Sequence, residues 1–437
     1  ETLEKNETWK TLSASSPPRE SLTLFYSLDR AIPFFLKGRG SVSHALQLYR
    51  QGLACLSVDS GEAVITLSVI PGSGGGLMPL PGYPVDLGGR AGTYVLALPY
   101  GTSHAARLVT VVDGTRVLSV DFATLDRHVL ENESPVWCVP ASGLDPEKPE
   151  EASLWVVTDR GDTSLVTGNL EVTKGFPVST SESLSASPLP DSGRVFLPLA
   201  DGTLRAIDSS GNVAQVTVPF TDPLKSPPSA SEASARRYFA AYPKSFSGML
   251  WLMDGAWSLL PGWPVSVSGI AFGSPVLCPS ARGMELAFLT QSGELTLRDE
   301  AGRIAQGFPV RLPGVFFFQP AYDGEFLWAV SSSGVLYKVA LDGTVLSQQI
   351  PDFTAENGMV LASDVDGDGV PEIFVSGDGN ALFGYTRAFA LMDGFPLPIW
   401  GTPAIADVNG DGTVECAGVG LDNRLYCWQF RKKRSHR

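Results

Sequence analysis

Residues 262–310 read GWPVSVSGIAFGSPVLCPSARGMELAFLTQSGELTLRDEAGRIAQGFPV, and a tetrad of Gly, an aromatic residue, Pro and an aliphatic residue stands at each end. The same tetrad occurs three more times, at Gly82-Tyr-Pro-Val85, Gly175-Phe-Pro-Val178 and Gly394-Phe-Pro-Leu397. The five copies are separated by 93, 87, 45 and 87 residues, and each interval is close to 45 or to twice 45. The chain is therefore built from a repeat of about this length.

Each repeat has the pattern of a small antiparallel sheet. Apolar runs such as Met284–Thr290 and Gly293–Arg298 alternate with Gly-centred turns, as expected for a meander. A period of about 40 to 50 residues with four strands is typical of β-propeller blades. We therefore predict an all-β chain that forms a single β-propeller of four-stranded antiparallel blades. Eight blades fit the spacing best, with seven and nine as alternatives, and the tetrad aromatic is interpreted as packing between blades.

The two ends of the chain set the predicted domain boundaries. Thr402–Phe430 supplies only three clear strands, and the early segment Leu22–Tyr26 resembles the missing end of a unit. Pairing of this N-terminal strand with the last blade would close the ring and remove both sheet edges. We predict a flexible leader at residues 1–20, the propeller at residues 21–430 and a basic tail at residues 431–437.

Charge and hydropathy exclude several classes of protein. The formal charge is −14 although the last seven residues carry five positive charges, so no nucleic-acid partner is expected. No run of about 18 apolar residues predicts a transmembrane segment. The polar leader is interpreted as the remainder of a secreted chain whose signal was removed or omitted, which predicts an extracytoplasmic location. A tether to a membrane through this leader stays open.

Two acidic loops lie 43 residues apart, at the same place in consecutive repeats. In each loop, side-chain oxygens at positions 1, 3, 5 and 9 and the main-chain carbonyl of position 7 form an all-oxygen set that suits Ca²⁺. The predicted ligands are Asp364, Asp366, Asp368, Val370 and Glu372 in the first loop, and Asp407, Asn409, Asp411, Thr413 and Glu415 in the second loop.

These loops are predicted to be two structural Ca²⁺ sites rather than EF-hands. Position 12 of an EF-hand would fall on Val375 and Gly418, and a strand-like run follows each loop directly. The cation would join two strands, and its removal would leave neighbouring carboxylates repelling one another. The equivalent loops of other repeats, such as Tyr322-Asp-Gly-Glu325, lack most ligand oxygens and are predicted to hold no metal.

The acidic motif also carries a family resemblance. The pattern D-x-[DN]-x-D-G-x-x-E in a β repeat, with Ala271-Phe-Gly-Ser-Pro275 opening another repeat, resembles the FG-GAP/VCBS repeats of integrin-α-like propellers. The metal motif covers two repeats near the C-terminus, and the tetrad extends the likeness over most of the chain. The resemblance implies a calcium-binding propeller of seven or eight blades. It also implies calcium loops on one face and a protein or glycan ligand on the opposite face.

Cys416 and Cys427 are the cysteine pair to consider for a disulfide. The ten residues between them read as a hairpin that would place the two side chains opposite each other. A cross-strand disulfide and two buried free thiols both fit this pattern. The five cysteines of the chain show no C-x-x-C spacing, so neither a zinc site nor a redox pair is predicted.

Large apolar residues stand where the chain enters two of the predicted innermost strands. They are Phe316, Phe317, Phe318 and Trp400. Packing between blades is one interpretation of these residues, and anchoring of a ligand on this face is the other.

No catalytic motif stands out. The four His residues lie at no metal-ligand spacing, and no Gly-x-Ser-x-Gly, P-loop or H-E-x-x-H motif occurs. We therefore predict a non-enzymatic, extracytoplasmic binding or scaffolding propeller for protein interaction or adhesion at a cell surface or envelope. Arg205–Gly211 and Lys338–Gly343 resemble strand-turn pieces of quinoprotein-like repeats. The alternatives are therefore an envelope-assembly scaffold of that type and a quinone-dependent dehydrogenase.

Overall fold

The computed structural model describes most of the chain from Leu77 onward and three strands before it. The described ranges are 22–27, 51–59, 62–70, 77–98, 106–141, 153–243, 248–351, 353–356, 358–379 and 381–431. Every regular element in these ranges is a β-strand, from β1 to β35. The described residues thus contain no helix with the length and apolar character that a membrane span needs. The prediction of an all-β chain is confirmed.

The strands from β6 onward group in chain order into antiparallel units, six of four strands and two of three strands. Unit 1 holds β6 (Ala91–Leu98), β7 (Arg107–Val112), β8 (Arg116–Asp121) and β9 (Arg127–Glu131). Unit 2 holds β10 (Val136–Pro140), β11 (Ser153–Thr158), β12 (Asp162–Thr167) and β13 (Val178–Ser179). Unit 3 holds β14 (Leu189–Asp191), β15 (Arg194–Pro198), β16 (Leu204–Asp208) and β17 (Val213–Val216). Unit 4 holds β18 (Ser229–Ala233), β19 (Arg236–Ala241), β20 (Met249–Asp254) and β21 (Val265–Ser266).

The second half of the chain continues the pattern. Unit 5 holds β22 (Val276–Ser280), β23 (Gly283–Leu289), β24 (Glu294–Arg298) and β25 (Val310–Arg311). Unit 6 holds β26 (Ala321–Tyr322), β27 (Phe326–Val330), β28 (Val335–Ala340) and β29 (Val345–Gln349). Unit 7 holds β30 (Met359–Ser363), β31 (Glu372–Ser376) and β32 (Leu382–Tyr385), with a single bridge from Leu397 to Leu382 in fourth place. Unit 8 holds β33 (Trp400–Ala406), β34 (Glu415–Val419) and β35 (Arg424–Phe430).

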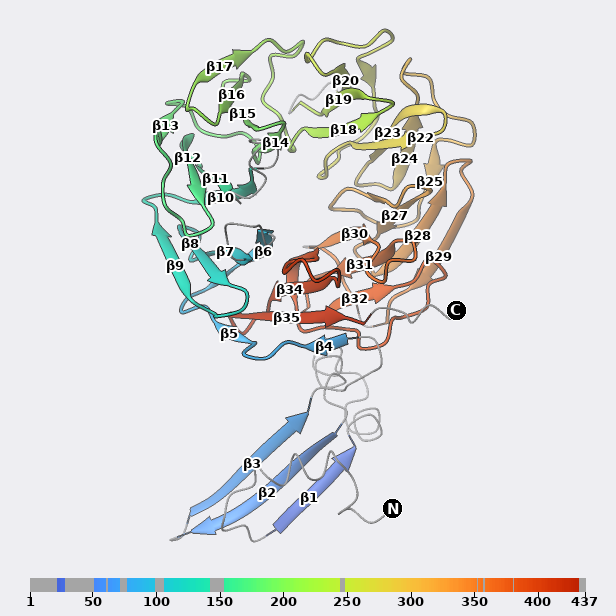
Figure 1. Ribbon diagram of the computed structural model, residues 1–437. Coiled ribbons are helices and arrows are strands. Elements are labelled where there is room, and N and C mark those ends of the chain that lie inside the picture. Colours follow the sequence, from blue (N-terminus) through green and yellow to red (C-terminus); the bar gives the residue numbers. More distant parts are fainter. Residues whose placement is uncertain are drawn as a thin grey trace.

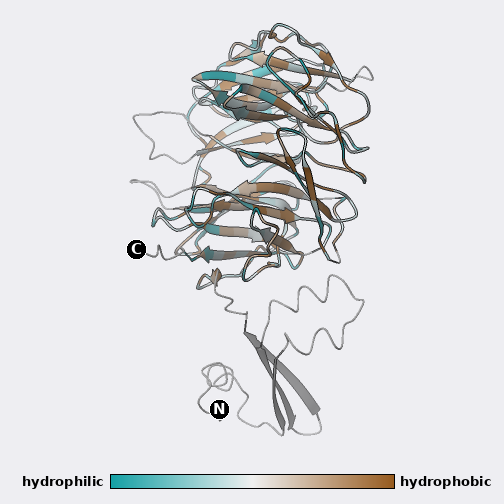
Figure 2. Cartoon of the chain, turned by 90° about the vertical axis from the view of Figure 1, so that its right-hand side faces the viewer, coloured by the Kyte–Doolittle hydropathy of each residue, from teal (hydrophilic) through white to brown (hydrophobic). Residues whose placement is uncertain are grey.

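The units stand around a ring, and the first strand of each unit lies innermost (Figure 1). Eight hydrophobic clusters are found among the described residues, and each is shared by two neighbouring units. Trp328 of unit 6 and Ile373 of unit 7, for example, belong to one cluster and are fully buried. Figure 2 shows apolar colour along the strands of the ring, where these clusters lie. Burial between sheets, rather than within one sheet, therefore holds the ring together.

The strand that completes unit 8 differs from the one expected. Leu22–Ser27 forms β1 and pairs with β2 (Gln51–Asp59), which pairs with β3 (Glu62–Ile70) in a sheet of its own. Instead, β35 pairs with β4 (Leu77–Pro79) and with β5 (Val85–Asp86). An N-terminal segment does join the last unit, but the strands of the ring begin at Leu77, not at residue 21. The tetrad at Gly82–Val85 explains this, because a tetrad leads into the outermost strand of a unit.

The tetrads occupy equivalent places. In each of them the aromatic-Pro peptide bond is cis and the Gly has a positive φ. Trp263, at the end of unit 4, is 5% exposed, and its Nε1 donates a hydrogen bond of 2.9 Å to the Glu300 carbonyl of unit 5. A Cβ added to Gly262 would collide with the backbone of Ala301 in that same unit. These contacts support the interpretation of the tetrad as a packing element between units.

The ring has two unlike faces because the strands of a unit are antiparallel. Linkers such as residues 312–320 lead into the first strands at one end, which we name the entry face. The loops that join first and second strands lie at the other end, which we name the hairpin face. Both acidic loops are of this second kind, since they join β30 to β31 and β33 to β34.

Candidate metal and ligand sites

The first acidic loop is a hairpin with one apolar residue turned into the core. Ser363 and Glu372 are paired in the β30–β31 ladder, so the loop closes directly on itself. Val365 is 3% exposed and belongs to the cluster between units 7 and 8. Gly367 and Gly369 have φ values of 78° and 82°, which residues with a Cβ rarely adopt. The two Gly residues therefore allow the sharp reversal of the chain.

Backbone amides hold the carboxylates of this loop in place. Both oxygens of Asp364 accept hydrogen bonds, from the Gly367 amide at 2.8 Å and the Gly369 amide at 2.9 Å. Glu372 is 4% exposed and accepts a hydrogen bond of 3.1 Å from the Val365 amide. Carboxylate oxygens of Asp364, Asp366 and Glu372 lie within 4.8 Å of one another. Oxygens that share one Ca²⁺ at about 2.3–2.6 Å lie within about 5 Å of each other, so this group fits the ion.

The two remaining predicted ligands of this loop lie nearer its surface. An Asp368 oxygen accepts a hydrogen bond of 2.8 Å from the Val370 amide, and the Val370 side chain is 41% exposed. Neither belongs to the group of three carboxylates. The structure thus brings together three of the four side-chain ligands that the sequence predicts for this loop.

The second acidic loop repeats the backbone but not the carboxylate cluster. Asp407 accepts hydrogen bonds of 2.8 Å from the amides of Gly410 and Gly412, as Asp364 does from its own pair. The Gln429 amide group, however, donates 3.1 Å hydrogen bonds to both Asp411 and Glu415. Among the described residues only the first loop gathers three acidic ligands so closely. A cation in the second loop would have to replace the contacts of Gln429.

Glu415 shows how unfavourable a bare carboxylate is at this position. Its side chain is fully buried and accepts a hydrogen bond of 2.8 Å from the Val408 amide. Burial raises the pKa of Glu415, and the charges of Asp411 and Asp407 raise it further, against hydrogen bonds from Val408 and Gln429. A positive charge at this point would offset both effects.

The predicted aromatic residues separate into two groups. Phe316 is 2% exposed and packs on Tyr337 with ring centroids 5.9 Å apart, so its assignment to the ligand face was wrong. Phe317, Phe318 and Trp400 instead line one cavity of about 310 Å³ on the entry face. The other lining residues are Thr93, Glu356, Gly358, Gly401 and Thr402.

Four units contribute to this entry cavity. Phe317 and Phe318 lead into β26, Glu356 leads into β30, Trp400 begins β33, and Thr93 lies in β6. Gly401 has a φ of 82°, and a Cβ there would collide with the backbone of Thr93. The backbones of units 8 and 1 therefore pack closely against each other on one side of the cavity, and the aromatic side chains lie beside them.

An exposed apolar patch extends from the entry cavity. Phe272 is 48% exposed, and its ring centroid lies 5.6 Å from that of Phe317. Ile270 and Val315 are 55% and 41% exposed in the same two linkers. The Lys225 ammonium lies 5.2 Å from the centroid of Phe272. Neighbouring exposed apolar residues with charged surroundings are typical of interaction surfaces.

Comparison with known proteins identifies the architecture. No family model matches the chain, and no curated protein does. Solved structures do match in fold, including BamB from Moraxella catarrhalis, which is 14% identical with a TM-score of 0.54 over 81% of this chain and 100% of that chain. Sqt1 from Saccharomyces cerevisiae is 9% identical, with a TM-score of 0.60 over 80% and 98%. The chain is a β-propeller.

A third structure similar to this propeller is BBS1N, solved in complex with ARL6DN. It is 10% identical, with a TM-score of 0.52 over 69% of this chain and 91% of that chain. At such identities the likeness concerns the fold alone, and each four-stranded unit is one blade. The resemblance of the acidic loops to FG-GAP/VCBS repeats stays a prediction.

The propeller keeps Cys416 and Cys427 as free thiols. In the β34–β35 ladder Cys416 faces Trp428, and Cys427 faces Ala417, so the two cysteines are one residue out of register. Successive strand residues point to opposite faces of a sheet. Cys416 therefore packs in the cluster between blades 7 and 8, and Cys427 in the cluster between blades 8 and 1. Of the two arrangements that the sequence left open, the structure therefore has the two buried free thiols and not the disulfide.

One buried ion pair between blades had no sequence signal. Asp323 stands in the hairpin loop of blade 6, where the acidic loops stand in blades 7 and 8. Its carboxylate is fully buried and lies 2.9 Å from Nε of Arg387, which belongs to blade 7. The Trp328 indole donates a further hydrogen bond of 2.8 Å to Asp323. In this blade an arginine of the neighbouring blade supplies the positive charge at the hairpin face.

Proposed function

We propose that the chain is a non-enzymatic propeller that binds a protein partner outside the cytoplasm, and that the partner docks on the entry face. The convergence of Phe317, Phe318 and Trp400 on one cavity supports this most directly. Aromatic side chains in a pocket with a polar rim are the residues that carry most of the binding energy in protein interfaces. The neighbouring patch at Phe272 would enlarge the contact.

The comparisons support a protein as the partner class. BBS1N, which is similar to this chain in fold, was crystallised with the protein ARL6DN. The choice of face rests on the position of the aromatic residues. The entry cavity lies at the opposite end of the blades from the acidic loops.

The composition of the entry cavity favours binding over catalysis. Glu356 is the one ionisable side chain among its lining residues. Acid–base chemistry needs a second group within hydrogen-bonding reach of the substrate, or a cofactor that supplies the chemistry. An aromatic cavity with a single carboxylate is better suited to hold a side chain of a partner.

Calcium belongs to the same proposal as a structural ion. Asp364, Asp366 and Glu372 would hold one Ca²⁺ in blade 7, and Asp407, Asp411 and Glu415 a second, weaker one in blade 8. The ion would supply positive charge where strands of a blade meet and would do no chemistry on the partner. The proposed location would supply millimolar calcium, which suffices for sites of this kind.

A capture experiment from native membranes tests the proposal. The tagged chain is used as bait in calcium and in chelator, beside the double variant Phe317→Ala, Trp400→Ala. We expect a captured protein to be lost with the double variant and kept with Leu391→Ala, an exposed apolar residue of the hairpin face. Equal capture by all three forms would overturn the entry face as the binding site. Envelope proteins in the captured set would indicate a scaffold, and host matrix proteins an adhesin.

A further inference from the structure

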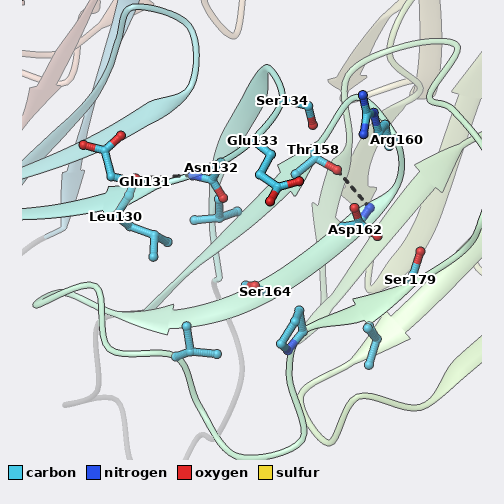
Figure 3. A pocket seen from close by; sticks show the side chains of 14 residues that line it. Leu130, Glu131, Asn132, Glu133, Ser134, Thr158, Arg160, Asp162, Ser164 and Ser179 are labelled. Atoms are coloured by element: carbon cyan, nitrogen blue, oxygen red, sulfur yellow. Dashed lines mark hydrogen bonds between the residues drawn. The ribbon is translucent and has the colours of Figure 1, made fainter.

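A second cavity lies between the outer strand of blade 1 and the sheet of blade 2. Its volume is about 390 Å³, within the range of ligand-binding clefts. We name it the side groove. Figure 3 shows its upper end, where Glu133 approaches from the linker after β9 and Asp162 stands at the start of β12, with Ser164 and Ser179 further along. None of its lining residues takes part in the entry cavity.

The side groove has an apolar floor. Val156 at its base is 2% exposed, and Val172 on its rim is 45% exposed. Leu130, Pro177 and Val178 continue the apolar surface. Since β13 is only two residues long, it pairs with β12 at Asp162 and Thr163 alone. The short outer strand leaves space beside β12 that a longer strand would fill.

Acidic side chains stand at the upper end of this floor. Glu131, Glu133 and Asp162 are exposed lining residues, and Arg160 is the one basic lining residue. Three carboxylates against one guanidinium give the groove a formal charge of −2. Among the described residues, no ion pair involves any of these four side chains, whereas nearby Asp113 pairs with Arg116 at 2.6 Å. The groove thus presents negative charge that the propeller itself does not neutralise.

The backbone that carries these carboxylates is fixed. The Asp162 amide donates a hydrogen bond of 3.0 Å to Oγ1 of Thr158, and Gly161 before it has no room for a Cβ beside Thr180. Nδ2 of Asn132 donates to the carbonyls of Thr115 and Leu130 at 3.0 and 3.3 Å. The backbone around these carboxylates therefore needs little ordering when a ligand binds, which reduces the entropic cost of binding.

We infer that the side groove binds an extended segment of a partner protein that carries lysine or arginine beside apolar residues. A cation would lie between Glu133 and Asp162, and the apolar side chains would cover Val172 and its neighbours. Side chains of an extended segment alternate, so one segment can place basic residues on the rim and apolar ones on the floor. This inference rests on the proposed protein-binding function but concerns different residues and a different part of the ring.

Fluorescence anisotropy with a defined probe tests the side groove. The probe is a labelled peptide of alternating valine and lysine, at about 50 mM salt so that charges are weakly screened. A peptide with glutamate in place of lysine is the control. Each lost charge-assisted contact reduces affinity about tenfold, so we expect Glu133→Gln with Asp162→Asn to weaken binding at least that much.

A charge-matched variant makes the result specific. Glu182→Gln with Asp222→Asn removes two exposed carboxylates of the entry face that do not line the groove. We expect this variant to bind the lysine peptide within about twofold of the unchanged chain. Equal weakening in both variants would show general attraction to an acidic protein and would overturn the site. So would equal binding of the lysine and glutamate peptides, or no binding of the lysine peptide. Circular dichroism of each variant confirms that it is folded.

Discussion

Gly307 of blade 5 and Gly343 of blade 6 lie so close that neither position has room for a Cβ. A Cβ on Gly343 would collide with the Gly307 carbonyl, and one on Gly307 with the backbone of Asp342. The relationship recurs at other blade boundaries. A Cβ on Gly211 would lie 2.7 Å from the carbonyl oxygen of Gly175, and one on Gly302 would lie 2.7 Å from that of Gly262. The tetrad Gly thus meets a turn Gly of the next blade.

This contact predicts a large effect for Gly307→Ala. Alanine is disfavoured here for two reasons. The φ of 88° is one that residues with a Cβ rarely adopt, and the added methyl group would collide with backbone atoms of the next blade. We expect a loss of about 3 kcal/mol or more in the free energy of unfolding, measured by urea denaturation.

Gly324→Ala is the matched control for this substitution. Its φ is 94°, but a Cβ there would meet nothing within 4 Å. Only the left-handed conformation should cost free energy, about 1–2 kcal/mol. Equal losses for both variants would mean that the contact between blades contributes little.

The acidic loops predict a calcium-dependent stability. Calcium at about 100 times its Kd would stabilise the folded chain by about 2.7 kcal/mol per site. Because the first loop gathers three carboxylates and the second is bridged by Gln429, we expect the first site to be tighter. Differential scanning fluorimetry in calcium and in chelator measures the effect, and magnesium is the ionic control.

Single substitutions assign the calcium effect to each loop. Asp364→Asn should abolish the response at low calcium, while Asp407→Asn should remove only the response at higher concentration. The double variant should melt at the same temperature in calcium and chelator. A wild-type chain without any calcium response would contradict the structural role of the loops.

The fold could be predicted from sequence because its main packing contact is repeated. A tetrad that meets the next blade in the same way each time leaves the same residues at a regular interval, as at Gly262 and Gly307. The closing strand was harder to predict. Leu22–Tyr26 and Leu77–Pro79 both have strand character, and only the contact with β35 distinguishes them. Such a contact joins residues about 350 positions apart and leaves no local pattern.

In the candidate sites, too, the sequence predicts local contacts but not those between distant residues. The clustering of the acidic side chains follows from local loop spacing, so the proximity of Asp364 and Glu372 could be predicted from the sequence. Gln429 and Arg387 could not, because each reaches its partner from another strand. The sequence could not decide between a disulfide and free thiols for the Cys pair, because a shift of one residue in register reverses the face to which a strand residue points.

The register of β34 and β35 predicts the thiol count. Without reductant in denaturant, Cys416→Ser should lower the number of free thiols by one, because no bridge is broken. With a disulfide to Cys427, the same substitution would raise the number by one. In the native state, burial raises the pKa of the Cys138 thiol to about 12, so little thiolate is present at neutral pH. The four thiols that the structure describes as buried should therefore react with a disulfide reagent only on unfolding.

The ion pair between Asp323 and Arg387 is buried, so we expect removal of Arg387 to destabilise the fold more than removal of the exposed Arg303. Arg387→Ala leaves the fully buried Asp323 carboxylate without its cation and should cost about 3–5 kcal/mol in the free energy of unfolding. Arg303→Ala removes an ion pair of 2.8 Å whose arginine is 79% exposed, and should cost less than about 1 kcal/mol. The double variant Asp323→Asn, Arg387→Ala should lose less free energy of unfolding than the two single variants lose together, because it no longer holds an uncompensated charge. Urea denaturation of the unchanged chain, Asp323→Asn, Arg387→Ala, the double variant and Arg303→Ala measures these losses. A loss for Arg387→Ala no larger than that for Arg303→Ala would show that this arginine does not hold blades 6 and 7 together.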